Sequence, residues 1–154
     1  MTWYEFLKTA HVLLAIMWLG GAIAFQLIGI RILRENPPVR LVGFTRDVEH
    51  IGMKIFLPAS LVLLLAGVLM VIDSPAWGFG DAWILIGLAG IVSTIVIGAG
   101  FLGPESGRLA ALIEQKGETD PVVVEKVARI LLISRVDLLI LLVIASNMVI
   151  KPGA

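Results

Sequence analysis

His11 and Trp18 stand seven residues apart in the first apolar segment of the chain, which continues into Leu19, Gly20 and Gly21. Seven residues make about two helical turns, so the imidazole and the indole lie on one face of a helix. An ionisable imidazole is costly in hydrocarbon and usually points into a bundle or a cavity. This face is therefore the first place in the sequence to look for ligand chemistry.

Two kinds of chemistry are open to His11. As an axial ligand it would hold haem b between helices, alone or with a thioether from Met70 or Met148, because haem accepts single-His and His/Met ligation. Trp18 and the glycine pair at 20 and 21 would then border the cofactor, the glycines leaving room for its plane. Alternatively, the imidazole is a hydrogen-bonding partner of Asn147 or of a backbone carbonyl, and only ties two helices together.

The other histidine, His50, is excluded as a second ligand for the same metal. From His11 to the inner end of the first apolar helix is about 19 residues, or roughly 30 Å, and His50 lies near that inner end on the next helix. The chain has no cysteine, which also excludes disulfides, thiolate metal sites and iron–sulfur clusters. No residue pattern predicts a particular catalytic reaction.

A second group of polar residues is expected near the inner ends of the helices, and it comprises Glu49, Lys54, Glu105, Arg135 and Asp137. Arg135 and Asp137 are about 200° apart around one helix, so they do not pair with each other. Glu49 or Glu105 is the expected partner of Arg135, and Lys54 that of Asp137. We expect these charges to lock the bundle; the alternative is a route for protons or ions.

The elements that must position these residues are transmembrane helices. Of the 154 residues 58% are hydrophobic and 16% charged, and the mean hydropathy is +0.99, outside the range of ordinary soluble domains. Twelve basic and twelve acidic residues balance, which gives no overall attraction to nucleic acid. A chain of this length has room for a single membrane domain over 1–154.

Hydropathy and helix signals predict an all-α antiparallel bundle of four transmembrane helices, over about 5–33, 41–72, 81–104 and 121–150, with a short surface helix over about 107–116. Asn36-Pro37-Pro38 is expected to end the first helix. Gly117 should end the surface helix, and Asp120 with Pro121 should begin the last. The last helix is the weakest prediction, because its charge-free part over 138–150 covers only about 20 Å.

Basic residues predict the orientation, because Lys and Arg gather in cytoplasmic loops. The first and third connections hold Arg31, Arg34, Arg40, Arg46 and Lys54, and Arg108, Lys116, Lys126 and Arg129. The second connection, 73–81, has none. Loops one and three are therefore expected in the cytoplasm of a bacterium and both termini outside its inner membrane. An aromatic group, made up of Trp3, Tyr4, Trp77 and Trp83, then lies at the outer interface, where amphipathic aromatic side chains are favoured.

The pattern His11-x6-Trp18-x-Gly20-Gly21, the basic loop, Pro58, Trp83 and the final Lys151-Pro152 together resemble a bacterial family of four-helix integral membrane proteins of unknown function, over essentially the whole chain. More remotely, the His and Trp-x-Gly arrangement is similar to HemJ-type protoporphyrinogen oxidases and to copper-resistance D-type membrane domains. The HemJ likeness implies a haem b held by His11 in a small redox protein. That family also uses a lysine at the start of its third helix, and the matching residues 81–85 contain none.

Three functions follow as expectations. The first is a haem-b-binding redox protein that uses His11. The second is a non-catalytic subunit or scaffold of a larger membrane complex or a homo-oligomer, docking through small-residue helix faces such as Ala89 with Ser93. The third is transport of protons or ions through the inner polar residues.

Overall fold

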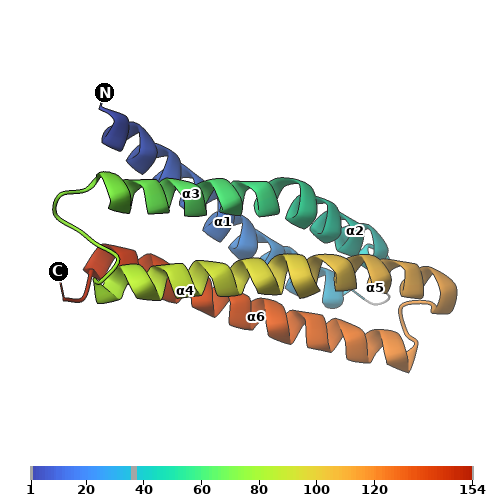
Figure 1. Ribbon diagram of the computed structural model, residues 1–154. Helices are drawn as coiled ribbons and strands as arrows, with labels where there is room; N and C mark the ends of the chain where they lie inside the picture. Colours follow the sequence, from blue (N-terminus) through green and yellow to red (C-terminus); the bar gives the residue numbers. More distant parts are fainter. Residues whose placement is uncertain (1, 36–37, 154) are drawn as a thin grey trace.

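The computed structural model describes residues 2–35 and 38–153, and there every regular element is a helix (Figure 1). In chain order these are α1 (Trp3–Leu33), α2 (Leu41–Ile51), η1 (Gly52–Phe56), α3 (Leu57–Asp73), α4 (Ala82–Ile97), η2 (Gly98–Leu102), α5 (Gly103–Lys116) and α6 (Pro121–Ile150). The short elements η1 and η2 are π-helical turns that join their neighbours without a break. The described chain thus forms four long helices: α1, α2–η1–α3, α4–η2–α5 and α6.

The expected all-helical membrane fold is confirmed at this level. Three of the long helices, Trp3–Leu33, Leu41–Asp73 and Ala82–Lys116, are long and apolar enough to cross a membrane. The fourth, α6, is a single helix of 30 residues but is not among those three. Arg135 and Asp137 lie within it, as the sequence required, and its crossing of the membrane stays a prediction.

The third long helix differs from the expectation. It was predicted to end at about Pro104, with a separate surface helix over 107–116, whereas the structure continues it to Lys116. The π-helical turn at Gly98–Leu102 ends two residues before Pro104, and its looser hydrogen bonding accommodates a residue that has no N–H to donate. The prediction of a separate surface helix is therefore wrong.

The helix ends follow local chemistry. Thr2 caps α1 in a reciprocal box, in which Glu5 N–H donates to Thr2 Oγ1 over 3.2 Å and Thr2 N–H donates to Glu5 Oε2 over 2.7 Å. Gly117, at φ +86°, ends α5, and Asp120 Oδ1 accepts from Val122 N–H over 2.8 Å to begin α6. The predicted signals at 117–121 are confirmed. Asn36 and Pro37, the expected break after the first helix, lie outside the described residues.

The four long helices pack side by side. The main contacts are α1 with α3, α2 with α5 and α4 with α6. In Figure 1 both chain ends lie at the same end of the molecule as the loop between α3 and α4. We call this the terminal end, and the end with the connections after α1 and after α5 the loop end. A buried cluster around Trp18, Leu63, Ile91 and Leu141 fills the terminal half, and one around Ile32, Leu109 and Val123 fills the loop half.

Candidate functional site

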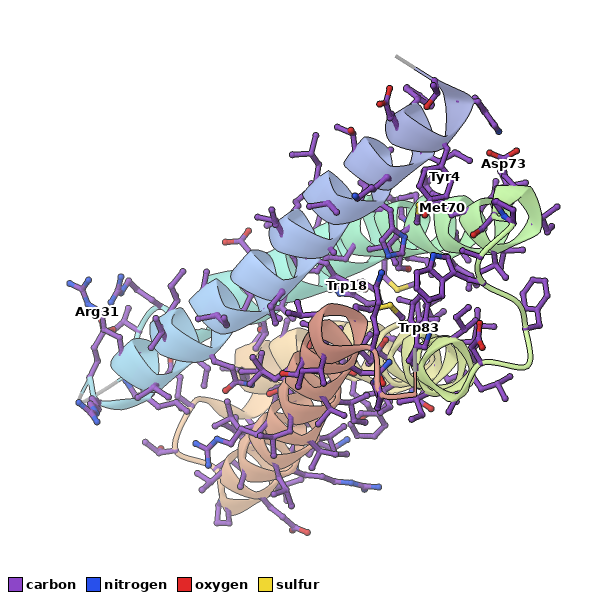
Figure 2. The ribbon with its side chains drawn as sticks, turned by 90° about the vertical axis from the view of Figure 1, so that its left-hand side faces the viewer. Tyr4, Trp18, Arg31, Met70, Asp73 and Trp83 are labelled. Atoms are coloured by element: carbon purple, nitrogen blue, oxygen red, sulfur yellow. The ribbon has the colours of Figure 1, made fainter. Side chains whose placement is uncertain are left out.

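Among the described residues, a terminal and a central cavity lie between the helices, and they separate the polar residues by depth. The terminal cavity, of about 340 Å³, is lined by α1, α3, α4 and α6, and its walls include Tyr4, His11, Met70 and Trp83. The central cavity, of about 140 Å³, lies toward the loop end. Trp18 lines both and is buried between them. In Figure 2, Tyr4, Met70 and Asp73 gather at one end of the molecule and Arg31 lies at the other, with Trp18 between them.

The His11 side chain is held in one orientation by the backbone of α3. Its Nδ1 lies 3.0 Å from the carbonyl oxygen of Leu63. A carbonyl can only accept, so Nδ1 must donate, and in a neutral imidazole this leaves Nε2 with a free lone pair. The interhelical hydrogen bond to a carbonyl, one of the two roles considered for His11, is therefore present. The same bond leaves the other nitrogen available to a ligand in the terminal cavity.

Two glycines that the sequence did not single out shape this cavity. A Cβ on Gly67 would lie 3.1 Å from His11 Cε1 and 3.4 Å from its Nδ1, so the imidazole rests directly on the backbone of α3. A Cβ on Gly87 would overlap the terminal methyl of Met148. The only signal in the sequence was a glycine within an apolar helix, which commonly marks a close approach.

The thioethers of Met70 and Met148 both line the terminal cavity, as their predicted depth requires. Among the described residues, Asn147 makes its hydrogen bond to Trp83 rather than to His11: its Nδ2 donates to the carbonyl of Trp83 over 2.6 Å. The indole Nε1 of Trp83 is buried without a hydrogen-bond partner in the described structure. It is a donor that an acceptor on a bound molecule would satisfy.

An aromatic pair and a cation close the terminal end of this cavity. The rings of Trp77 and Trp83 meet edge to face with centroids 5.6 Å apart. Lys151 Nζ lies 4.7 Å and 5.1 Å from their centroids, in cation–π geometry. Since both indoles line the cavity, the ammonium group lies at its rim. Trp83 and Tyr4 thus belong to the predicted aromatic group and also form part of the cavity wall.

Gly20 and Gly21, which were expected to border the cofactor, do not line the terminal cavity. Gly20 is exposed on the outside of α1, with nothing within 4 Å of the place a Cβ would occupy. A Cβ on Gly21 would overlap the ring of Phe56, which means that Gly21 serves the packing of α1 against η1. Successive residues are about 100° apart around a helix, and neither direction reaches the cavity.

The central cavity holds Asp137 and Gln26. Asp137 is 7% exposed, and its Oδ1 is buried without a partner in the described residues. The amide of Gln26 donates from Nε2 to Ser134 Oγ over 2.5 Å, while its Oε1 is likewise buried and unpartnered. Ser60 and Thr94, both almost fully buried, line the same space. The sequence placed Asp137 near the inner end but did not predict a cavity around it.

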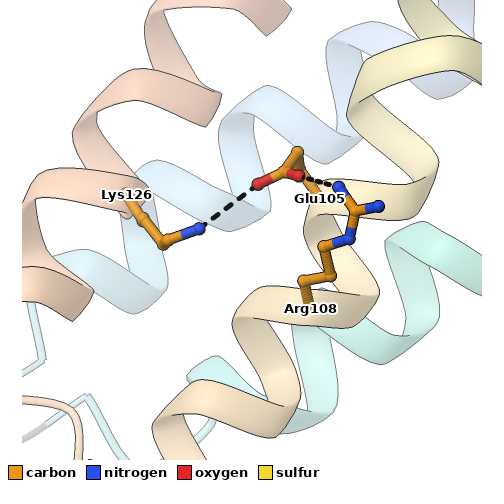
Figure 3. A network of polar contacts seen from close by, with 3 residues as sticks. All are labelled: Glu105, Arg108 and Lys126. Atoms are coloured by element: carbon orange, nitrogen blue, oxygen red, sulfur yellow. Dashed lines mark hydrogen bonds and ion pairs between the residues drawn. The ribbon is translucent and has the colours of Figure 1, made fainter.

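In the described part of the chain, no ion pair joins any two of the five residues of the expected inner polar cluster. Glu105 pairs with Arg108 on its own helix and with Lys126 of α6, 3.4 Å away (Figure 3). Lys54 and Arg135 are exposed, and in the described part of the chain neither forms an ion pair. Glu49 lies over Gly107 on the surface between α2 and α5. The predicted pairs of Arg135 with Glu49 or Glu105, and of Asp137 with Lys54, are wrong.

Comparison with known proteins gives one match. A family model described as "Predicted integral membrane protein (DUF2269)" matches residues 5–152. No curated protein and no solved structure matches the chain, so the likeness to HemJ-type and copper-resistance D-type proteins stays an expectation. The long match agrees with three helices apolar enough to span a membrane. The chain therefore belongs to the DUF2269 family of integral membrane proteins.

Proposed function

We propose that this protein binds haem b in the terminal cavity through Nε2 of His11 and serves a redox role in the membrane. The observation that carries the proposal is the hydrogen bond from Nδ1 to the Leu63 carbonyl, 3.0 Å long, on a ring that lines a cavity. Metal-bound histidines commonly donate their second nitrogen to a carbonyl or carboxylate, which fixes the tautomer and the ring orientation.

The residues present fit the group in three further ways. A cavity of about 340 Å³ is within the range of small-molecule sites, roughly 300–1,000 Å³. The thioethers of Met70 and Met148 line its walls and are available as a second axial ligand, which haem accepts beside histidine. Lys151 at the rim supplies the positive charge that the two carboxylates of a haem need.

In this role the protein binds and orients the cofactor and keeps water from it, while haem iron supplies one-electron transfer when bound. The Leu63 carbonyl holds His11 in the tautomer that leaves Nε2 free. Gly67 and Gly87 keep two places free of side chains, one for the imidazole and one for the Met148 methyl group. The indole N–H of Trp83 would donate a hydrogen bond to a carboxylate of the cofactor.

An absorption spectrum tests the proposal. The protein is purified in detergent from a host grown with ample haem precursor, and a Soret band that shifts on reduction is expected. His11→Ala should lose the band. The matched control is His50→Ala, because His50 is the other histidine of the chain and is exposed on α2. A folded protein without a Soret band, or one whose band survives His11→Ala, would refute haem binding at His11.

A scaffold role is the second candidate, and one surface favours it. Ala89 and Ser93 are exposed at i and i+4 on α4, beside exposed Val92 and Val96. Small residues at this spacing let a partner helix approach closely in lipid. Co-purification with a larger membrane complex or a stable homo-oligomer, together with the absence of a bound cofactor, would favour this candidate over the haem proposal.

We further propose the orientation that the charges favour, with loops one and three in the cytoplasm of a bacterial cell and both termini outside the inner membrane. The support is the absence of Lys and Arg from 73–81 against their number in the other two connections. In this arrangement the chain crosses the membrane four times in alternating directions, and α6 is the fourth transmembrane helix although it contains Arg135 and Asp137.

A further inference from the structure

We propose that the central cavity is a binding site for a monovalent alkali cation, with Na⁺ as the probe, and that Asp137 is its charged ligand. The proposal does not depend on haem in the terminal cavity. It starts from two acceptors on residues that line one cavity, Asp137 Oδ1 and Gln26 Oε1, both buried and without a partner in the described structure. Unpaired buried acceptors are rare in native proteins, and a hydrogen-bond donor or a bound cation would satisfy them.

The cavity is rich in acceptors because its hydroxyl groups donate elsewhere. Ser60 Oγ donates to the Leu57 carbonyl over 2.7 Å and Thr94 Oγ1 to that of Ile91 over 3.0 Å. Ser134 Oγ donates to the Leu131 carbonyl over 3.1 Å and accepts from the Gln26 amide. Each hydroxyl hydrogen is therefore directed at its own helix. The oxygen lone pairs of Ser60 and Thr94 are what remains for the cavity.

Two π-helical turns border the same space. Residues of η1 and η2 line the cavity from opposite helices, among them Gly52 and Gly98. The Leu57 N–H donates to the Gly52 carbonyl, five residues back, and the next residue, Pro58, has no N–H. Pro104 follows η2 in the same way. Since Pro58 and Pro104 have no N–H, each removes one intrahelical donor beside the cavity, and interruptions of this kind hold Na⁺ in other membrane helices.

Charge decides which ion fits. The residues that line the cavity include one carboxylate, Asp137, and no lysine or arginine. The part of the chain that the structure describes has no group of three or more His, Cys, Asp or Glu able to hold a metal together. A single negative charge in an apolar bundle is balanced by a monovalent cation rather than a divalent one. About 140 Å³ also leaves space for water, which needs only about 15 Å³ per molecule.

Thermal unfolding of the full chain in detergent tests the site. NaCl is compared with N-methyl-D-glucamine chloride at constant ionic strength. The N-methyl-D-glucamine cation is too large for the cavity. We expect the unfolding midpoint to rise with the logarithm of the Na⁺ concentration, because a ligand that binds only the folded state stabilises it. In Asp137→Asn, the same rise of the unfolding midpoint should require at least a tenfold higher Na⁺ concentration. Asp73→Asn, at an exposed carboxylate, should leave it unchanged.

Direct binding of radioactive ²²Na⁺ to the wild-type protein keeps the test decisive if Asp137→Asn does not fold. Gln26→Met, which retains the carboxylate but removes the unpartnered amide oxygen, should then bind ²²Na⁺ more weakly. No saturable ²²Na⁺ binding, or equal midpoints in the two salts, would overturn the proposal and leave a site for protons or water only. Neither result bears on haem, which is read from the Soret band of the same samples.

Discussion

Some of the glycines in the helices leave room for a side chain of a neighbouring helix to reach the centre of the bundle, and others do not. Gly67 and Gly87 give room to His11 and Met148 at the terminal cavity. Gly20 and Gly21, which stand beside Trp18 in the sequence, are neighbours with opposite surroundings: one is open to lipid and the other is covered by Phe56. The type of residue alone could not separate these two cases, because each depends on rotation about the axis of α1.

Gly21→Ala is therefore expected to destabilise the protein by about 1–3 kcal/mol, since an added methyl group would overlap the Phe56 ring in a packed core. Gly20→Ala, the adjacent control, should leave stability unchanged or raise it by up to about 1 kcal/mol, because alanine is the better helix former. Unfolding of both variants in a titration from mild detergent into dodecyl sulfate measures the difference. Equal effects at the two positions would contradict the packing of α1 against η1.

One ion pair outside the apolar segments predicts a pH effect. The Arg40 guanidinium bonds to Glu35 and lowers the pKa of that carboxyl group below its ordinary value. A carboxyl whose pKa is lower in the folded state adds stability above its unfolded pKa, and this is lost as pH falls through the folded pKa. The effect should be small, because 54% of the Arg40 side chain and 32% of the Glu35 side chain are accessible to solvent.

A ¹³C NMR titration of the Glu35 carboxyl group measures this shift. Arg40→Gln is expected to move its midpoint back up toward the value of a free glutamate, because the first cause of the shift is the hydrogen bond from Arg40. Arg46→Gln, which removes a different exposed pair with Glu114, is the control and should not move it. An unchanged Glu35 midpoint in Arg40→Gln would show that the pair does not form in solution.

Two of the long helices, α2–η1–α3 and α4–η2–α5, each contain a π-helical turn followed by a proline. Gly52 and Gly98 each begin a π-helical turn, and Pro58 and Pro104 each stand six residues after that glycine. A proline inside an α-helix clashes with the preceding turn and removes a hydrogen bond, and a π-turn relieves the clash. The sequence rule that proline ends a helix applies to Pro104 only in the absence of such a turn. This is why the predicted break before 107 was wrong.

The continuous helix makes a prediction about distance. Spin labels on Val96→Cys and Gln115→Cys, both at exposed positions, lie 19 residues apart on either side of Pro104. One helix with a rise of about 1.5 Å per residue sets their backbones about 28 Å apart with a narrow distribution. The chain has no native cysteine, so the labels are specific. Electron spin resonance measures the distance. A markedly shorter or broad distribution would instead indicate a separate surface helix after Pro104.

For the whole molecule, depth along the helices could be predicted from the sequence, whereas rotation about them could not. Counting the rise from each end placed His11, Met70 and Met148 at one level and Asp137 at another, and the two cavities separate them in this way. The ion pairs were missed because Lys126 faces Glu105 and Arg135 faces outward. Each π-turn inserts an extra residue and rotates everything beyond it, which a pattern of regular helices does not include.

Orientation in the membrane decides which side of the bilayer the terminal cavity lies toward, since Trp77 of the loop over 74–81 lines that cavity. The charge distribution favours the outside for that loop. Ala76→Cys, exposed in this loop, is expected to react in intact cells with a thiol reagent that cannot cross membranes. Thr119→Cys, exposed between α5 and α6, should react only after the membrane is opened.

The reverse pattern of labelling would invert the topology and place the terminal cavity toward the cytoplasm. Labelling of both cysteines in intact cells would mean that the segment between them does not cross as one helix, or that the protein inserts in both orientations.

A third cysteine variant tests whether α6 crosses the membrane. Lys151 lies over Trp77, so Lys151→Cys should react like Ala76→Cys if α6 spans the bilayer with Arg135 and Asp137 inside it. A protected cysteine at 151 beside a reactive one at 76 would contradict that arrangement.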